Sequence, residues 1–239
     1  MAFPTEADLN PYVKTSMDFL TALKNNENTD AFAERYANFT VEELSEGLET
    51  NDERLAFWIN TYNAFIQRKL KANPSLYENR GSFFKEKFIN IGGDKFAFAD
   101  IEHGIIRRSQ FEYFLGYISN PFAGTWEKKL RVKKRDFRVH FALNCGAKAC
   151  PPVGIYDSRY LDKQLDISTT KFLNTFTSVK EGKIYSTSLF SWFRGDFGGI
   201  KGAKDILANY DIIQDSDKGK EFKLSYDWTL YLDNYVEFE

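Results

Sequence analysis

The sequence is poor in the side chains that most often carry out nucleophilic or acid–base chemistry near neutral pH. It contains two cysteines, two histidines and two methionines among 239 residues. Two cysteines cannot supply the several bridges of a small disulfide-rich secreted scaffold. Thiol or imidazole chemistry must therefore use very few residues, and the positions of those residues are informative.

Long apolar runs are also missing. The run Leu55–Ile59 is among the longest, whereas a membrane-spanning helix needs about 20 apolar residues. The start of the sequence carries charges at Glu6, Asp8, Lys14 and Asp18, and no apolar segment typical of a secretory signal interrupts them. These absences predict a cytoplasmic protein without a membrane span, although prior removal of a leader would leave the same pattern.

No charge of one sign dominates, because 32 Lys and Arg stand against 34 Asp and Glu, with a net charge of −2. Proteins that wrap nucleic acid usually carry a basic excess, so we expect no nucleic-acid partner. One basic run, residues 128–138, holds seven Lys or Arg and one Asp, interspersed with Leu130, Val132 and Phe137. We interpret this run as a solvated, edge-protecting strand rather than a patch for an anionic partner.

Apolar and aromatic residues, in contrast, are abundant, at 43% and 17% of the chain. That content is sufficient for a sizeable core and excludes disorder of the whole chain. The length is typical of one domain of ordinary size. We expect residues 1–50 to form an N-terminal helical extension that packs on a core domain spanning residues 51–239.

Helix signals dominate the first third of the sequence. Thr40 and Glu43 form a capping box for a short helix. The clearest helix begins at Asn51 or Asp52 and ends before Pro74. Apolar side chains recur along it at steps of three and four residues, and they form one broad face: Leu55, Trp58, Ile59, Tyr62, Phe65, Ile66 and Leu70.

The rest of the chain mixes strand and helix signals. Residues 92–94, Gly-Gly-Asp, lie between two short aromatic and β-branched runs, which indicates a hairpin. Asp100 is placed to cap a helix over residues 101–114, and alternation over residues 138–144 predicts a central strand with His140 on its less apolar face. Further expected elements are a helix capped by Asp157 or Ser158 and strands at residues 183–187 and 222–226. This mixture predicts a single α+β domain, with the helical N-terminal part packed on a small mixed sheet with hairpins.

All cysteines and histidines lie within one stretch of 48 residues. Cys145 follows the predicted central strand and begins the cysteine loop, residues 145–154, a position that presents a thiol at the rim of a sheet. Gly146 leaves room for backbone N–H groups to face a substrate oxyanion. Lys148 lies close enough in sequence to lower the pKa of the thiol.

These features predict a thiol-dependent hydrolase or transferase that acts on a small-molecule or peptide substrate and needs no cofactor. Cys145 is the expected nucleophile, with His103 or His140 as its base. Glu102 is adjacent to His103 but lies about 100° around a helix from it, so we expect Glu102 to orient His140 or to act as an acid or base itself. Asp196, in an aromatic stretch, is expected to be a buried polar anchor or a site carboxylate.

Three other interpretations use the same side chains. His103, His140, Cys145 and Cys150 have the ligand types of a tetrahedral zinc site, but their spacing is not typical of one, so we expect no metal site. The two cysteines can close a short redox disulfide, although they lack the C-x-x-C spacing. The remaining interpretation is a non-catalytic binding or scaffold domain whose cysteine loop is a structural lock, because free Cys is usually a small buried residue.

Several blocks of the sequence resemble one known family. They are residues 57–64 (FWINTYNA), 101–107 (IEHGIIR) and 138–152 (RVHFALNCGAKACPP), followed by Trp192, Asp196-Phe197 and residues 226–228. Together, over roughly residues 50 to 230, they resemble the domain of unknown function DUF 547, a family without a settled activity. The resemblance implies that the family motifs include eight residues of this chain: Asn60, Asn63, Glu102, His103, Arg107, His140, Cys145 and Cys150.

Polar side chains inside apolar blocks are costly to bury without partners. Their grouping in these motifs therefore favours one shared cleft. We expect five residues to form its binding side: Asn60, Asn63, Arg107, Cys150 and Asp196. Either Glu102 or Asn63 is then the group that orients the reacting atoms or holds an oxyanion.

Overall fold

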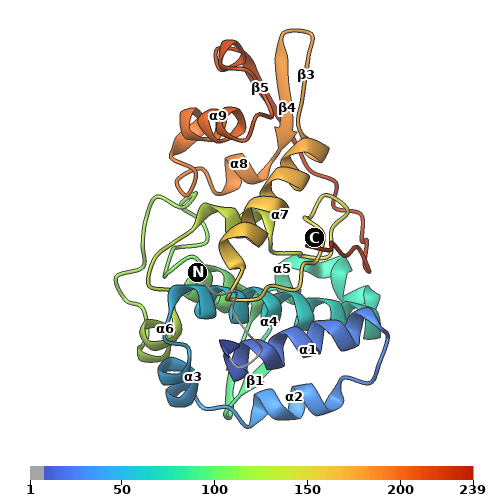
Figure 1. The fold of residues 1–239 in the computed structure, drawn as a ribbon, viewed down its shortest axis with the longest axis vertical. Coiled ribbons are helices and arrows are strands. Elements are labelled where there is room, and N and C mark those ends of the chain that lie inside the picture. Colours follow the sequence, from blue (N-terminus) through green and yellow to red (C-terminus); the bar gives the residue numbers. More distant parts are fainter. Residues whose placement is uncertain (1–7, 239) are drawn as a thin grey trace.

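The long helix α4 (Asn51–Ala72) lies at the centre of the computed structural model, which describes residues 8–238. Thr50 caps this helix: its hydroxyl accepts the N–H of Glu53, and the Glu53 carboxylate accepts the N–H of Thr50. The predicted helix is confirmed, including its start at Asn51 and its end before Pro74. Most side chains of α4 are buried, and α1 (Pro11–Lys24) packs along it (Figure 1).

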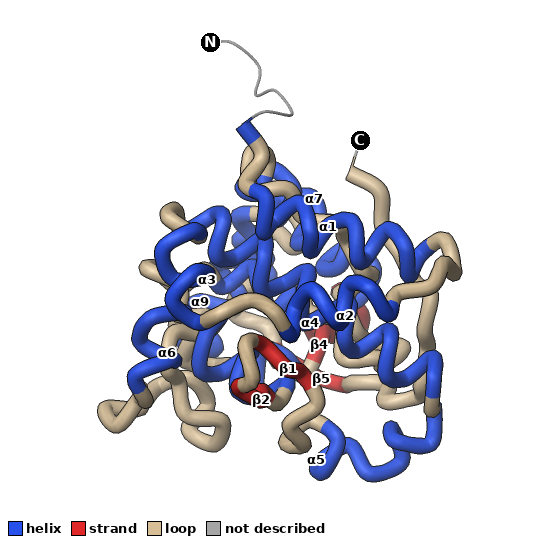
Figure 2. Tube along the Cα trace, turned by 90° about the horizontal axis from the view of Figure 1, so that it is seen from below, coloured by secondary structure: helices blue, strands red, loops and turns tan. Residues whose placement is uncertain are grey.

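The other elements are mostly short, and Figure 2 shows the strands as brief segments among the helices. The α-helices are α2 (Asp30–Ala37), α3 (Val41–Gly47), α5 (Arg80–Phe83), α6 (Thr125–Leu130), α7 (Leu161–Phe176), α8 (Leu189–Trp192) and α9 (Gly199–Asn209). The 3-10 helices are η2 (Pro74–Asn79), η4 (Phe137–Phe141) and η5 (Asp215–Asp217), and η3 (Asp100–Ile106) is a π-helix. The strands are β1 (Ile89–Ile91), β2 (Asp94–Phe96), β3 (Ser178–Lys180), β4 (Lys183–Thr187) and β5 (Glu221–Ser225). Within residues 8–238, no helix is both long and apolar enough to cross a membrane.

The strands form two small sheets. β1 and β2 form the predicted antiparallel hairpin, in which Ile89 pairs with Phe96. β4 pairs antiparallel with β3 and parallel with β5, so the three-stranded sheet is mixed. β4 has the predicted bounds, and β5 begins one residue before the predicted strand. The α+β class is therefore confirmed, with the three-stranded sheet at the end of the molecule opposite α1 and α2 (Figure 1).

The N-terminal helices pack on both α4 and the hairpin. Phe19 of α1 contacts Phe65 of α4 edge to face, with ring centroids 5.3 Å apart. The N–H of Gly92 in the hairpin donates to the carbonyl of Ala37 at the end of α2. Gly92 has a φ of 60°, and a Cβ there would collide with the carbonyl of Phe39, so only glycine fits. A domain boundary at residue 50 stays a prediction.

Residues 138–144 do not form the predicted central strand. They begin within the 3-10 helix η4, where the Asp136 carboxylate accepts the N–H of Arg138 at the helix start. The residues of η4 from Val139 onward are all buried, so alternation cannot separate a buried face from an exposed one. Val139 belongs to the larger apolar cluster and Phe141 to the second cluster, which places η4 where the two clusters meet.

The helix predicted over residues 101–114 is shorter than expected and has π geometry. It ends at Ile106, and the N–H of Arg107 donates to the carbonyl of Glu102, five residues back. Asp100 is the first residue of the helix rather than its cap.

Two smaller expectations are also corrected. The basic run of residues 128–138 contains the end of α6, a loop and the start of η4, and is not an edge strand. The helix α7 begins after Tyr160 rather than at a cap formed by Asp157 or Ser158, because the Asp157 carboxylate instead accepts the N–H of Arg159 in a turn.

Candidate functional site

One cavity, with a volume of about 310 Å³, brings together the predicted catalytic residues. Its polar lining consists of Tyr62, Glu102, His103, Glu112, His140, Cys145 and Tyr226, and its apolar wall includes Phe84, Trp192, Phe193 and Trp228. The predicted binding residues Asn60, Asn63, Arg107, Cys150 and Asp196 do not line it directly. Arg107, Cys150 and Asp196 instead bond residues of its lining, whereas Asn60 and Asn63 bond backbone segments nearby.

Asn60 and Asn63, near the middle of α4, are wholly buried and bind backbone groups. Asn63 Nδ2 donates to the carbonyl of Ala142 at 2.9 Å, and its Oδ1 accepts the N–H of Asn144 at 2.8 Å. Asn60 makes the same pair of bonds to the carbonyl and N–H of Tyr156, at 2.8 and 2.9 Å. Asn63 therefore fixes the segment that leads into the cysteine loop, whereas Asn60 fixes the segment that leads to α7.

Polar groups within the cysteine loop fix its shape. The N–H of Gly146 donates to Asn144 Oδ1 at 2.9 Å, and the N–H of Cys145 donates to Cys150 Sγ at 3.0 Å. Gly146 has a φ of 91°, and a Cβ there would lie 2.7 Å from Leu70 Cδ1, so the position requires glycine. Both amides are thus occupied, which corrects the expectation that they face a substrate oxyanion.

The two thiols are neighbours and are not joined in a disulfide. The hydroxyl of Tyr226 lies 3.4 Å from Cys145 Sγ and 3.1 Å from Cys150 Sγ. The hydrogen bond with Cys150 has the largest effect on Cys145 and lowers the pKa of its thiol, with Tyr226 acting in the same direction. Burial raises the pKa of the Cys150 thiol. Lys148, expected to act on Cys145, instead lies 3.8 Å from the carboxylate of Asp227.

A chain of hydrogen bonds, His103–Arg107–Asp196–His140, runs behind the cavity, and we call it the buried relay. Asp196 Oδ2 lies 2.8 Å from His140 Nε2 and 2.7 Å from Arg107 Nε, and Arg107 Nη1 lies 2.8 Å from His103 Nδ1. The Arg107 and Asp196 side chains are only 1% and 6% exposed. Burial opposes the charge of Asp196, but the bonds and charges of His140 and Arg107 outweigh it and lower the pKa of this carboxyl to about 2.

The buried relay determines where each imidazole carries its proton. A guanidinium only donates hydrogen bonds, so His103 Nδ1 accepts from Arg107 and the proton of His103 is on Nε2. An ionised Asp196 only accepts, so His140 donates through Nε2 and keeps Nδ1 as an acceptor. Burial, followed by the charge of Arg107, lowers the pKa of His103 to about 4, and burial also lowers the pKa of His140. Two neutral imidazoles therefore face one cavity, one offering a donor and the other an acceptor.

Glu102 is a further titratable group in the lining of the cavity. The hydroxyl of Tyr62 donates to Glu102 Oε2 at 3.2 Å, and Glu102 Oε1 lies 3.9 Å from His103 Nδ1. Burial raises the pKa of the Glu102 carboxyl. Asp196, rather than Glu102, is the carboxylate that holds His140.

The four side chains of the zinc hypothesis do not converge on one point. One nitrogen of each imidazole is already bonded, to Arg107 or to Asp196. No hydrogen bond between residues 8 and 238 joins Cys145 Sγ to an imidazole, and this part of the chain contains no group of three His, Cys, Asp or Glu side chains arranged to hold a metal ion. The structure thus offers this hypothesis no ligand set.

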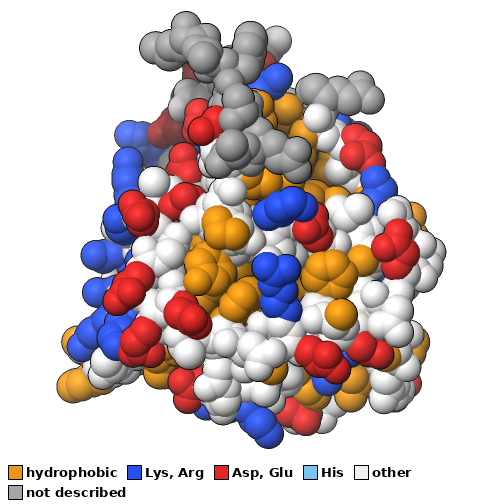
Figure 3. All heavy atoms as spheres, turned by 60° about the horizontal axis from the view of Figure 1, so that its bottom comes forward, with side chains coloured by type: hydrophobic (Ala, Val, Ile, Leu, Met, Phe, Trp, Pro, Cys, Tyr) orange, Lys and Arg blue, Asp and Glu red, His pale blue; other side chains and the backbone are white. Residues whose placement is uncertain are grey.

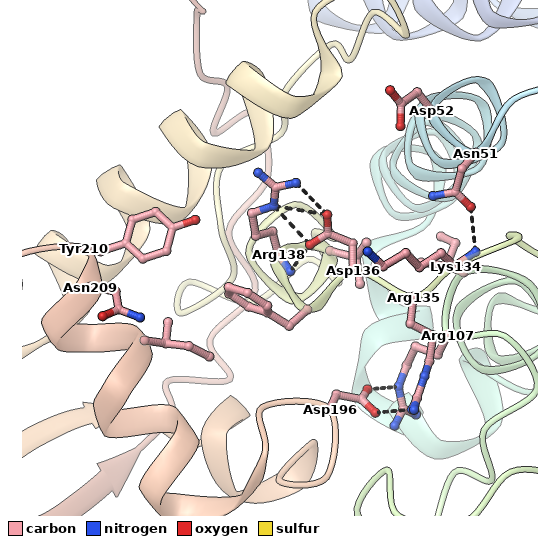
Figure 4. A pocket seen from close by; sticks show the side chains of 14 residues that line it. Asn51, Asp52, Arg107, Lys134, Arg135, Asp136, Arg138, Asp196, Asn209 and Tyr210 are labelled. Carbon is pink, nitrogen blue, oxygen red and sulfur yellow. Dashed lines mark hydrogen bonds and ion pairs between the residues drawn. The ribbon is translucent and has the colours of Figure 1, made fainter.

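A second, wider cavity, of about 970 Å³, is lined by Arg107 and Asp196, whose imidazole partners line the first cavity. Figure 4 shows Arg107 and Arg135 converging on Asp196, while Arg138 faces Asp136. Arg135 Nη1 lies 3.2 Å from Asp196 Oδ1, and Arg138 is bonded by three carboxylates. The arginines of this cavity are therefore already paired with acids.

Two tyrosines that contact the predicted catalytic side chains escaped the sequence prediction. Tyr62 is predicted from its spacing to be an apolar contact of α4, and its ring is buried there, but its hydroxyl bonds Glu102. Tyr226 belongs to a C-terminal block whose role the sequence does not reveal, and its hydroxyl contacts both thiols. The only available signal was the position of each tyrosine inside a motif block.

The family model described as "Protein of unknown function, DUF547" matches residues 46–173, more than half of the chain. No curated protein and no solved structure matches the chain. The matched residues include α4, η3 and the cysteine loop, whereas Asp196 and Tyr226 lie beyond them. On this match, the chain belongs to the DUF547 family.

Proposed function

We propose that this protein is a thiol-dependent transferase or hydrolase acting on a small-molecule or peptide substrate. The observation that supports the proposal is that Cys145, His140 and Glu102 line one cavity of about 310 Å³. Cys145 is partly exposed, whereas Cys150 is 2% exposed. Because a nucleophilic thiol must be both accessible and readily ionised, Cys145 is the nucleophile in this proposal.

In this proposal, His140 is the base and His103 is a hydrogen-bond donor. Asp196 holds His140 Nε2 at 2.8 Å, as the carboxylate of a catalytic triad holds its imidazole, and leaves Nδ1 to accept a proton. The acceptor nitrogen of His103 is occupied by Arg107, so its Nε2–H can donate to an oxyanion on the substrate. In this assignment the oxyanion donor is His103, because the N–H groups of Cys145 and Gly146 already donate to other groups within the protein.

The proposed reaction begins when substrate binding brings the thiol and the imidazole together, because free catalytic sites often have long or missing bonds between these groups. The proton of Cys145 passes to His140 Nδ1, and the sulfur forms a bond to an electrophilic carbon of the substrate. The bond to the leaving group breaks, and that group takes the proton from His140. Water or a second substrate then releases the transferred group from the sulfur.

The competing class, a non-catalytic binding or scaffold domain, explains Cys150 better than Cys145. Cys150 Sγ accepts the N–H of Cys145 and is buried, as a structural lock requires. Cys145, in contrast, lines a cavity whose other walls carry titratable groups. In our proposal, Cys150 therefore fixes the loop and Cys145 reacts.

The experiment is alkylation of the native protein by iodoacetamide across pH, followed at each cysteine by peptide mass spectrometry. We expect the reactivity midpoint of Cys145 to lie below ~8.5, the usual pKa of a free thiol. Cys150→Ala should raise that midpoint because it removes the hydrogen bond with the largest effect on Cys145. In parallel, p-nitrophenyl acetate should acetylate Cys145 with a stoichiometric burst that Cys145→Ala abolishes. A midpoint at or above ~8.5 together with no acetylation of Cys145 would overturn the proposal.

A further inference from the structure

Residues 111–122 form a closed loop with an unusually apolar exposed surface. Its base is held by backbone bonds from Phe111 N–H to the Ile118 carbonyl, at 3.1 Å, and from Asn120 N–H to the Ser109 carbonyl, at 2.6 Å. Six of its large apolar side chains are between 39% and 87% exposed: Tyr113, Phe114, Leu115, Tyr117, Ile118 and Phe122. Only four other large apolar residues in the described part of the chain are comparably exposed. Such a contiguous patch marks an interaction surface.

The inner side of the loop is fixed to the body of the protein. The N–H of Gly195 donates to the carbonyl of Leu115 at 2.6 Å. Leu115 and Gly116 have φ values of 53° and 83°, and a Cβ on Gly116 would lie 2.5 Å from Asp196 Oδ1. A leucine in this left-handed region costs backbone energy, which the surrounding contacts must offset. The loop is therefore held in one shape that directs large apolar side chains outward.

Basic side chains lie near this apolar surface. Lys85 Nζ lies 4.9 Å from the centre of the Tyr113 ring, and Arg131 Nη1 donates to Ser109 Oγ at 3.0 Å. Residues 108–135 contain seven Lys or Arg and only two Glu, in a chain whose net charge is −2. Figure 1 places this segment at the left edge of the molecule, and along the left edge in Figure 3 Lys and Arg side chains gather, with hydrophobic side chains protruding at the lower left.

We propose that residues 111–122 dock this protein on an anionic lipid surface. Aromatic and aliphatic side chains partition into the headgroup region of a bilayer, and nearby Lys and Arg gain further energy from anionic lipids. A second copy of the chain fits less well, because a symmetric contact would bring two basic rims together. Nucleic-acid bases would stack on the rings but would offer no partner for Leu115 and Ile118.

Docking in this way places the candidate site close to the lipid. Glu112 of the loop lines the smaller cavity, and so does Phe84, the neighbour of Lys85. Part of the wall of that cavity thus belongs to, or adjoins, the surface that would contact the membrane. The proposal rests on exposure and charge, and it stands whether or not Cys145 is a nucleophile.

The experiment is co-sedimentation of the full chain with vesicles made of equal amounts of phosphatidylcholine and phosphatidylglycerol, compared with vesicles of phosphatidylcholine alone. We expect binding to the anionic vesicles that weakens as salt is added. Replacing Phe114 and Phe122 together by Ser should weaken it more than about tenfold. Lys128→Gln should weaken it about fivefold.

The matched control is Tyr185→Ser, which removes an exposed aromatic from β4, outside the loop. It should leave vesicle binding unchanged, and near-UV circular dichroism should confirm that every variant is folded. The absence of binding to anionic vesicles would overturn the proposal, as would equal binding by the double Phe variant. A dimer in sedimentation velocity that the double Phe variant dissociates, or oligonucleotide binding without vesicle binding, would also overturn it.

Discussion

The two cavities that meet at the Arg107–Asp196 pair are built from opposite kinds of chemistry. The smaller one has aromatic walls and two imidazoles that burial keeps uncharged: burial lowers the pKa of His140 and lowers that of His103 to about 4. The larger one is lined by ions, and its arginines are bound to carboxylates. Neutral donors and acceptors suit proton transfer, whereas paired ions hold parts of the fold together.

Asp196 connects the larger, ionic cavity to the smaller, neutral one. Its Oδ2 accepts hydrogen bonds from His140 and Arg107, and its Oδ1 accepts one from Arg135. Because Asp196 carries the negative charge that both sides use, it decides the tautomer of His140 as well as the stability of the buried guanidinium. A substitution of Asp196 should therefore affect both cavities more than any other single change.

The largest effect is expected from Asp196→Asn. This change leaves the guanidinium of Arg107, only 1% exposed, without its anionic partner. Removal of one partner of a buried ion pair costs about 3–5 kcal/mol. We therefore expect the free energy of unfolding, measured in urea, to fall by about 4 kcal/mol. The control Asp18→Asn, which breaks an exposed pair with Lys14, should leave the urea midpoint almost unchanged.

The next largest effect is a loss of folding stability at acidic pH. His103 titrates near pH 4 when folded and at 6.5 in its unperturbed state, so between these values the unfolded chain binds more protons and stability falls as the pH falls. The loss amounts to about 3 kcal/mol for this group. Asp196, whose pKa is about 2 against 3.8 unfolded, adds a further loss below pH 4.

Urea unfolding at a series of pH values tests this assignment. His103→Gln keeps an acceptor for Arg107 but does not titrate, so it should flatten the curve between pH 6.5 and 4 and leave the loss below pH 4 in place. Some slope remains in the upper range, because burial lowers the pKa of His140 as well. A variant curve with the same slope as the parent protein would contradict the assignment to His103.

The helix that supports the site is more predictable from sequence than the site itself. The bounds of α4 follow from local signals, namely a capping box and a stripe of apolar residues. The scarcity of Cys and His is enough to place Cys145 and both imidazoles in one region. The bond from His140 to Asp196 spans 56 residues and depends on tertiary packing that no local pattern encodes.

The error at η4 has a related cause. Alternation of large and small residues indicates a strand only when one face is exposed, and here Val139, His140 and Phe141 are all buried. The signal that could have identified a helix start was Asp136, which caps η4 through the N–H of Arg138. Similarly, a helix was predictable at η3, but its π geometry was not.

A third, smaller effect distinguishes Asn60 from Asn63, the two buried asparagines of α4. Asn63→Ala and Asn60→Ala each leave a buried N–H and carbonyl without partners, so each should cost about 2 kcal/mol in urea unfolding. Only Asn63 holds the segment that enters the cysteine loop. We therefore expect Asn63→Ala to change the rate at which iodoacetamide alkylates Cys145, and Asn60→Ala to leave that rate unchanged. Equal effects of both variants on the thiol would show that the loop responds to stability alone.

The smallest effect is expected from Arg135→Gln, on the ionic side. The Arg135 side chain is 45% exposed, and its Nη1 lies 3.2 Å from Asp196 Oδ1. His140 is bonded to the other carboxylate oxygen, Oδ2. Solvent screens such a contact, so the free energy of unfolding should fall by less than about 1 kcal/mol. The alkylation midpoint of Cys145 should stay unchanged, because Arg107 alone neutralises Asp196 on the side that faces His140. A shift of that midpoint in the Arg135 variant would mean that the larger cavity controls the thiol through Asp196, and that the two cavities act as one electrostatic unit.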